Sequence, residues 1–347
     1  MGVIKYASKW NRQFKKWETP EHNQKFRSFA VGSYLPHTDI ILNSSEPEYN
    51  YVIISYGFRV EDHSNDTYKI NKYEFFIDRF VDYFMNNSKS NYIVRYVMLD
   101  ADAPLVEEAK KLASYIDNLA SMPGTKSINV VGLSKCGAIN MYTPKYFKNS
   151  KSYELTHVYN IATPYSGTTM ASPLYFYPKI KELVTSKLGD NTISNFIYKK
   201  LVDFYESRSS NSHMDYDIAK PGGVSEDKKD NYDEEFIKNI FSDENIEALK
   251  KIKGFENFTT HIDKDVIKKA IQTGDFNTIG LCILNSWFFD KKSDGFVLTS
   301  DQKLIENYLD VKSTDLASSH MIMTSDSLDT VLDSINKNVE NKQRTRC

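Results

Sequence analysis

The chain has 347 residues, with 44 Lys and Arg against 46 Asp and Glu, which gives a formal net charge of −2 at pH 7. Nucleic-acid binders usually carry a strong basic excess, so this balance argues against nucleic acid as a partner. Hydrophobic residues make up 40% and charged residues 26% of the chain, as in an ordinary globular protein. This composition excludes a collagen, a fully disordered chain and a disulfide scaffold.

The cysteines and the N-terminal residues bear on metal binding and location. Cys136, Cys282 and Cys347 show neither a CxxC pair nor zinc-ligand spacing, so no metal site is predicted. Residues 1–10 carry positive charge, but no apolar stretch follows them, as it would in a Sec signal. No run of eighteen apolar residues is present. A cytoplasmic location is therefore predicted, with export by a non-Sec route left open.

Strands and helices are expected to alternate through the first half of the chain. The first 50 residues are polar and are expected to be irregular, with Pro20, Pro36 and Pro47 as breakers. Short β-branched runs then predict strands, at 51–56, 92–98, 127–132 and 157–162. Apolar residues at helical spacing predict helices, at 70–86, 104–120 and from Ala138. This alternation predicts an α/β fold with a mostly parallel sheet and helices on both faces.

The alternation is then interrupted. Residues 168–208 predict two or three amphipathic helices, residues 235–253 predict another helix, and the pattern resumes with a strand at 278–284 and a helix near 326–341. We therefore expect one catalytic core that carries a helical insertion. The predicted parts are an N-terminal extension packed on the core (1–50), the first part of the core (51–168), a helical cap or lid (169–274) and the second part of the core (275–347).

A serine stands at the turn between the third predicted strand and its helix. The run is Gly132-Leu133-Ser134-Lys135-Cys136-Gly137. A serine on a sharp strand-to-helix turn projects its hydroxyl from the end of the sheet, and the turn needs small residues on either side. Cys136 occupies the place of the second glycine, and Gly137 comes one residue later. The alternative interpretation is a Gly-Ser turn before an ordinary helix.

An acid and a histidine follow later in the chain. Asp294 precedes Gly295 on a predicted turn, where its carboxylate can meet an imidazole; Asp290 is the nearest rival and lacks the glycine. His320 precedes the last predicted helix, and an imidazole can take a proton from a serine near neutral pH. The chain order of Ser134, Asp294 and His320 is the order of serine, acid and histidine in α/β-hydrolases, and it differs from the orders in chymotrypsin and subtilisin.

These motifs together resemble a lipase-like α/β-hydrolase. Residues 161–168 resemble the A-T-P-x-x-G-[ST] stretch of that family, and residues 55–58 stand where it has an oxyanion-hole motif, with Tyr56 in place of a histidine. The resemblance implies a triad of Ser134, Asp294 and His320 without metal or cofactor. It further implies backbone oxyanion donors at Lys135 and Phe58. Substrate contacts are expected at Tyr56, Gly57, His63 and Tyr165.

The expected function is that of a serine-dependent hydrolase acting on a lipid or other acyl ester. Two alternatives stay open, namely an acyltransferase that uses the same acyl-serine and an inactive hydrolase-fold binding protein. The insertion has three interpretations: a lid, a surface that meets lipid, and a cap for a soluble ester. The Lys135 side chain either favours an anionic substrate or extends into solvent.

Overall fold

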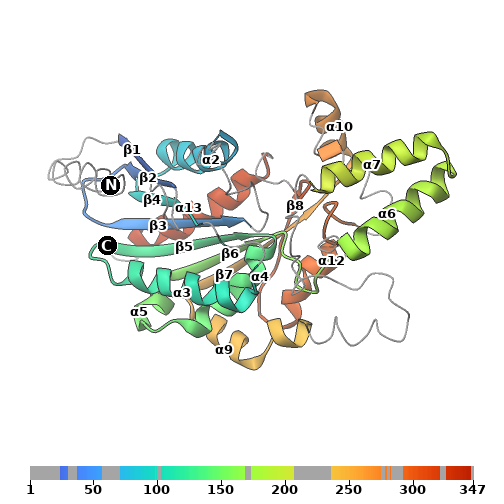
Figure 1. Cartoon of the computed structure of the whole chain (residues 1–347). Helices are drawn as coiled ribbons and strands as arrows, with labels where there is room; N and C mark the ends of the chain where they lie inside the picture. The colour runs from blue at the N-terminus through green and yellow to red at the C-terminus, as the bar shows by residue number, and fades with distance from the viewer. Residues whose placement is uncertain are drawn as a thin grey trace.

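A central eight-stranded sheet organises the part of the chain that the structure describes (Figure 1). The structure is a computed structural model, and it describes residues 24–29, 37–56, 71–97, 99, 103–168, 173–206, 236–274, 278–279, 282, 292–320 and 326–344. The strand order is β1-β2-β4-β3-β5-β6-β7-β8. β2 pairs antiparallel with β1 and β4, and all other neighbouring strands are parallel. The mostly parallel sheet of an α/β fold, which the sequence predicts, is therefore confirmed.

The strands have the following bounds: β1 Gln24–Phe29, β2 His37–Leu42, β3 Tyr49–Tyr56, β4 Tyr92–Tyr96, β5 Thr125–Leu133, β6 Thr156–Ile161, β7 Gly254–His261 and β8 Thr314–Ala317. The helices that pack on the sheet are α2 Asn71–Asn87, α3 Leu105–Ala120, α4 Lys135–Tyr142, α5 Ser150–Leu155 and α13 Leu328–Arg344, and α9 Asp243–Lys251 packs on α4. Two short helices, α10 Lys264–Thr273 and α12 Thr299–Gln302, follow β7 along the chain. The four strands and the flanking helices predicted between residues 51 and 162 are confirmed, with shifts of a few residues.

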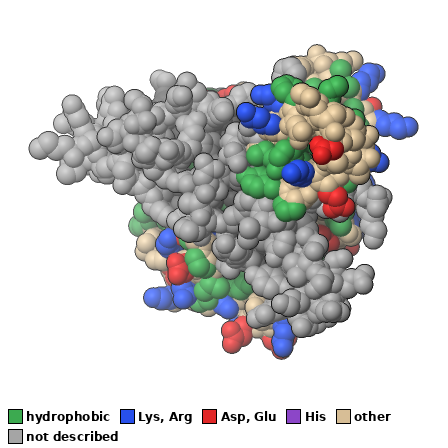
Figure 2. Space-filling model, turned by 45° about the vertical axis from the view of Figure 1, so that its right-hand side comes forward, with side chains coloured by type: hydrophobic (Ala, Val, Ile, Leu, Met, Phe, Trp, Pro, Cys, Tyr) green, Lys and Arg blue, Asp and Glu red, His purple; other side chains and the backbone are tan. Residues whose placement is uncertain are grey.

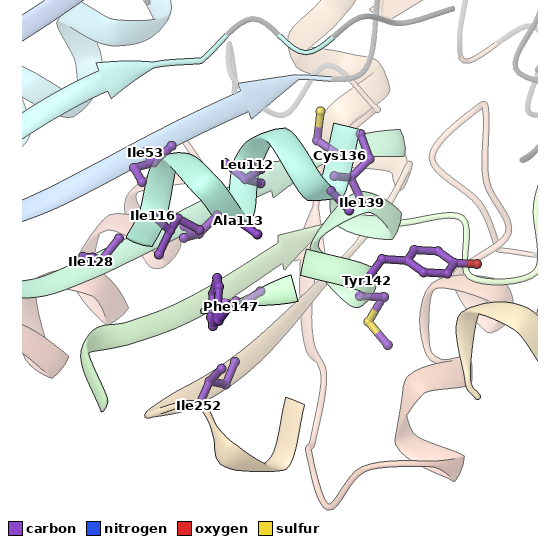
Figure 3. Packing of buried hydrophobic residues seen from close by; sticks show 14 of the residues in the cluster. Ile53, Leu112, Ala113, Ile116, Ile128, Cys136, Ile139, Tyr142, Phe147 and Ile252 are labelled. Atoms are coloured by element: carbon purple, nitrogen blue, oxygen red, sulfur yellow. The ribbon is translucent and has the colours of Figure 1, made fainter. Parts of the chain in front are cut away.

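Along β2, β3, β4 and β5, the buried side chains alternate between two hydrophobic clusters, one on each face of the sheet. Ile53 belongs to the cluster that includes α3 and α4, whereas Val52 and Ile54 belong to the cluster that includes α2 and α13. Figure 3 shows the first cluster, where Leu112 of α3 lies over the sheet. Because successive residues of a strand point to opposite faces, an unbroken apolar run indicates a strand covered on both sides.

A helical hairpin extends from the core, on the right of Figure 1. It consists of α6 Pro173–Leu188 and α7 Thr192–Glu206, two consecutive helices that pack against each other. These two helices match the amphipathic helices that the sequence predicts at residues 168–208. In the described part of the chain, none of the helices combines the length and hydrophobicity that crossing a membrane requires.

Two expectations about secondary structure are wrong. The first 50 residues are not irregular throughout, because β1 and β2 lie there and extend the sheet through antiparallel pairing. The resumed strand is β7, not residues 278–284, of which the described Thr278, Ile279 and Cys282 are helical. β7 lies inside the range 169–274 expected for the insertion, and it pairs with β6 and β8 in the sheet. How the chain divides into domains stays a prediction.

Candidate active site

Ser134 occupies the sharp turn between β5 and α4, as the sequence predicts. Its backbone has φ 56° and ψ −125°, in a region that residues other than glycine rarely adopt. Its N–H donates to the carbonyl of Ile161 at 2.9 Å, and its carbonyl accepts from Gly137 at 2.9 Å, so both ends of the turn are held. Ser134 is only 7% exposed. The constrained turn presents the hydroxyl at the carboxyl end of the sheet.

The small residues around Ser134 are required by close packing. A Cβ on Gly132 would collide with the side-chain amide of Asn140 and lie 2.8 Å from the carbonyl oxygen of Cys136. A Cβ on Gly137 would collide with the Thr163 side chain. Cys136, by contrast, packs its side chain into the hydrophobic cluster beside α3 (Figure 3). The second small position of this turn is therefore Gly137, which explains why Cys136 fits where a glycine was expected.

Asp294 lies on a turn that is anchored to the end of β7. The N–H of Ile262, the residue after β7, donates to the carbonyl of Ser293 at 2.8 Å. Asp294 is fully buried, and its Oδ1 accepts from the backbone N–H groups of Phe296 at 2.9 Å and Val297 at 2.8 Å. The anchoring strand is thus β7 rather than the expected strand at 278–284. The turn itself orients the carboxylate.

His320 brings the serine and the acid together. It follows β8, and its N–H donates to the backbone carbonyl of Asp294 at 2.9 Å. Its ring Nδ1 lies 2.8 Å from Asp294 Oδ2, and its Nε2 lies 3.0 Å from Ser134 Oγ. The imidazole is nearly inaccessible to solvent, and the Phe296 ring lies against it with a centroid distance of 5.0 Å. A continuous hydrogen-bonded line therefore runs from the hydroxyl to the carboxylate.

Two further side chains reach Asp294, and sequence reasoning missed both. Thr260 Oγ1 of β7 donates to Asp294 Oδ2 at 2.6 Å, and Gln302 Nε2 at the end of α12 lies 3.2 Å from the same oxygen. Both residues are fully buried. Neither residue belongs to a recognisable motif. The sequence offered one weak signal of a strand here, the two adjacent β-branched residues Thr259 and Thr260, and its hydrophobic pattern did not reveal that strand.

The Lys135 side chain follows neither of the two expectations. It is 1% exposed, and its Nζ donates to the carbonyl of Ala103 at 2.9 Å. The amine therefore joins α4 to the segment that precedes α3 instead of extending into solvent. Lys135 is also the first residue of α4, and the N–H groups of a first helical turn have no acceptor within their helix. This backbone position suits a donor to developing negative charge.

Tyr165 lies in the interior, which corrects the expectation of a substrate contact. The side chain is fully buried, and burial raises the pKa of its hydroxyl well above the ordinary value. The hydroxyl donates to Asn257 Oδ1 at 2.9 Å and accepts from Asn160 Nδ2 at 3.0 Å. An apolar ring with a polar tip fits such a core position as well as a pocket wall, and sequence alone does not separate the two.

The remaining predicted site residues are only partly within the described part of the chain. The backbone of Tyr56 ends β3 and pairs with Leu133, the residue before Ser134. This pairing brings the end of β3 next to the serine turn. Gly57, Phe58 and His63 lie outside the described residues. Within the described residues, no cluster of three or more histidine, cysteine, aspartate or glutamate side chains has a metal-binding arrangement.

A second acid and histidine face each other near the N-terminal ends of β6 and β7. His157 Nε2 of β6 lies 3.3 Å from Glu256 Oε1 of β7, and the imidazole stacks on Tyr159 at a centroid distance of 4.5 Å. Glu256 also accepts from Ser334 Oγ at 2.5 Å and from Asn338 Nδ2 at 2.6 Å, both on α13. This pair therefore connects the sheet to the last helix.

Comparison with known proteins gives structural likeness without sequence likeness. No protein-family model and no curated protein matches the sequence. Among solved structures, the chain is similar to the mature form of the Bacillus licheniformis lipase BlEst2, with 11% identity, a TM-score of 0.43 and coverage of 91% of this chain and 99% of that one. It is also similar to Est1E from Butyrivibrio proteoclasticus, with 8% identity, a TM-score of 0.40 and coverage of 92% and 99%. A Pyrobaculum calidifontis esterase has 10% identity, a TM-score of 0.41 and coverage of 98% and 94%.

Proposed function

We propose that the protein is a serine-dependent hydrolase of acyl esters. The observation that carries this proposal is the line of hydrogen bonds from Ser134 Oγ through the His320 ring to Asp294, with heavy-atom distances of 3.0 and 2.8 Å. A nucleophile within hydrogen-bond reach of a base that a third group orients is the general arrangement for acyl transfer. The strained turn at Ser134 supports the same assignment.

In the proposed reaction, Ser134 Oγ attacks the ester carbonyl carbon while His320 Nε2 takes the hydroxyl proton. Asp294 holds the ring through Nδ1 and stabilises the imidazolium that forms. The tetrahedral oxyanion accepts hydrogen bonds from the N–H groups of Lys135 and Phe58, a pair taken from the resemblance to lipase-like hydrolases. Each such donor typically contributes on the order of 10²–10³ in rate. His320 then passes its proton to the leaving alcohol.

The second half of the proposed reaction regenerates the serine. His320 removes a proton from a water molecule, whose oxygen attacks the acyl carbon and displaces Ser134 Oγ. The acid leaves, and the proton returns to the serine. An acceptor alcohol in place of water would make the protein an acyltransferase by the same steps. Product analysis with and without added alcohols separates hydrolysis from transfer.

The α6–α7 hairpin supports a substrate with an apolar acyl part and contact with a lipid interface. Ile193 and Phe196 on α7 are 67% and 61% exposed, and Leu188 at the end of α6 is 39% exposed. Figure 2, turned to bring this side of the molecule forward, shows hydrophobic side chains (green) next to Lys and Arg side chains (blue) at the upper right. Exposed apolar side chains bordered by lysines suit an anionic lipid surface. We propose that this hairpin acts as the lid.

The direct test is replacement of Ser134 by alanine. We expect the wild-type protein to hydrolyse p-nitrophenyl esters of graded chain length and to be labelled by a fluorophosphonate probe. The Ser134→Ala variant should lose labelling and lose roughly 10⁵-fold in kcat. Circular dichroism of both proteins checks that the variant is folded. Equal hydrolysis by the two proteins would overturn the proposal, and a wild-type protein that neither reacts nor labels would support an inactive binding protein.

A further inference from the structure

The Asp294 carboxylate accepts hydrogen bonds from other side chains besides His320. On Oδ2 alone, His320 Nδ1 lies at 2.8 Å, Thr260 Oγ1 at 2.6 Å and Gln302 Nε2 at 3.2 Å. All four residues are at most 2% exposed, so water does not compete for these contacts. Charge-assisted hydrogen bonds are strong and directional in such surroundings. Thr260 and Gln302 therefore limit how the carboxylate can turn.

Gln302 also joins the acid turn to β7. Its Oε1 accepts from the backbone N–H of Thr260 at 2.7 Å. Its Nε2 lies 3.1 Å from the carbonyl of Thr260 and 3.2 Å from the carbonyl of Val297 in the acid turn. One amide side chain thus contacts the strand, the turn and the carboxylate. A planar amide with both ends engaged keeps these three parts in a constant arrangement.

The same hydrogen bonds continue to the helix that follows Ser134. Asn257 Nδ2 donates to the carbonyl of Gln302 at 2.8 Å, and Asn257 Oδ1 accepts from the Tyr165 hydroxyl. Asn160 Nδ2 contacts the Tyr165 hydroxyl at 3.0 Å and the carbonyl of Gly137 in α4 at 2.9 Å. All of these side chains are at most 1% exposed. The acid turn and the serine turn are therefore linked through the interior.

We infer that Thr260 and Gln302 are positioning residues that hold the Asp294 carboxylate in the orientation in which His320 can serve Ser134. The inference rests on the proposed hydrolase function and deepens it. Both side chains are fully buried, so their effect passes through Asp294. In catalysis, a misplacement of a supporting group on the order of 1 Å costs as much as 10²-fold in rate. The two residues consequently act on turnover and leave ester binding unchanged.

The test replaces Thr260 by valine, which keeps the shape of the side chain and removes the hydroxyl. Active sites in each preparation are titrated with a fluorophosphonate, and p-nitrophenyl butyrate hydrolysis is expressed per active site. We expect kcat to fall roughly tenfold, with KM within about twofold of wild type. Thr260→Ser keeps the hydroxyl and should recover most of the rate. Gln302→Met, similar in length but without hydrogen-bonding groups, should also lower kcat with little change in KM.

The matched control is the neighbouring threonine on the same strand. Thr259 is also fully buried, and its hydroxyl donates to a different carboxylate, that of Asp315. Thr259→Val should lower thermal stability as much as Thr260→Val does, with wild-type kcat per active site. Wild-type kcat per active site in both Thr260→Val and Gln302→Met, in the presence of an active wild-type protein, overturns this inference alone. A wild-type protein without labelling or hydrolysis overturns the proposed function and the inference together.

Discussion

Among the described residues, two acid–histidine pairs are held by the same sheet and differ in what surrounds them. Asp294 and His320 lie 2.8 Å apart at the end of the strands, with side chains at most 1% exposed. Glu256 and His157 lie 3.3 Å apart on β7 and β6, with 31% and 12% exposure. The first histidine presents its other ring nitrogen to Ser134, whereas the acid of the second pair accepts hydrogen bonds from two side chains of α13. An acid next to a histidine is thus insufficient to mark a candidate catalytic site. The first pair is a candidate because it also faces a serine hydroxyl on a constrained turn.

The largest expected effect separates the two pairs by activity. Asp294→Asn keeps the shape of the side chain but removes the carboxylate, and it should lower kcat on the order of 10⁴-fold because the imidazole loses its orientation and the support for its charge. The matched variant Glu256→Gln should hydrolyse p-nitrophenyl esters at the wild-type rate. Similar losses in the two variants would show that the pairs do not have separate roles.

Two glycines, one in α4 just after Ser134 and one beside His157, provide the second comparison. Gly137→Ala would drive a Cβ into Thr163 behind the serine turn, where a β-branched side chain has little freedom to move. We expect it to lower the free energy of unfolding by roughly 1–3 kcal/mol. Gly254→Ala meets the ring of His157, which can turn about its side-chain bonds, and should cost less. Urea denaturation of both variants measures the difference, and a larger cost at Gly254 would contradict the expectation.

The third prediction concerns stability at the Glu256 pair. Glu256 accepts hydrogen bonds from Ser334 and Asn338, which attach α13 to the sheet. Glu256→Gln weakens these charge-assisted contacts, and it should lower the free energy of unfolding by about 1 kcal/mol near neutral pH. Chemical denaturation of the two proteins in the same buffer measures this loss. An unchanged stability would mean that the second pair does not contribute to holding α13.

The smallest expected effect is the pH dependence of that loss. Burial raises the pKa of Glu256, but hydrogen bonds from His157, Ser334 and Asn338 outweigh burial and hold the pKa below its ordinary value of 4.5. A carboxyl whose pKa is lower in the folded protein stabilises the fold above its unfolded pKa and loses this contribution as the pH falls through the folded pKa. The stability difference between wild type and Glu256→Gln should therefore shrink below about pH 4. A difference that grows on acidification would refute this assignment.

The predictable part of the fold is the part with strong local patterns. β3 is preceded and followed by breakers and contains the apolar run Val52-Ile53-Ile54, so its burial on both faces is visible in the sequence. β7 has the sequence Gly-Phe-Glu-Asn-Phe-Thr-Thr-His and looks unlike a buried strand. Its polar residues Asn257 and Thr260 are buried all the same, because they have hydrogen-bond partners in Gln302 and Asp294. Partners so distant along the chain leave no local periodicity.

For the candidate site, the sequence by itself singled out Ser134, Asp294 and His320, because a small-residue turn, an Asp-Gly turn and a late histidine are local signals. Their roles remain proposals, and the structure adds the distances on which those proposals stand. The interior position of Tyr165, the contact of the Lys135 amine with Ala103, and the donors on Asp294 were decided only by the tertiary structure. Burial and hydrogen-bond partnership are properties of neighbours in space, and those neighbours come from strands and turns far apart in the chain.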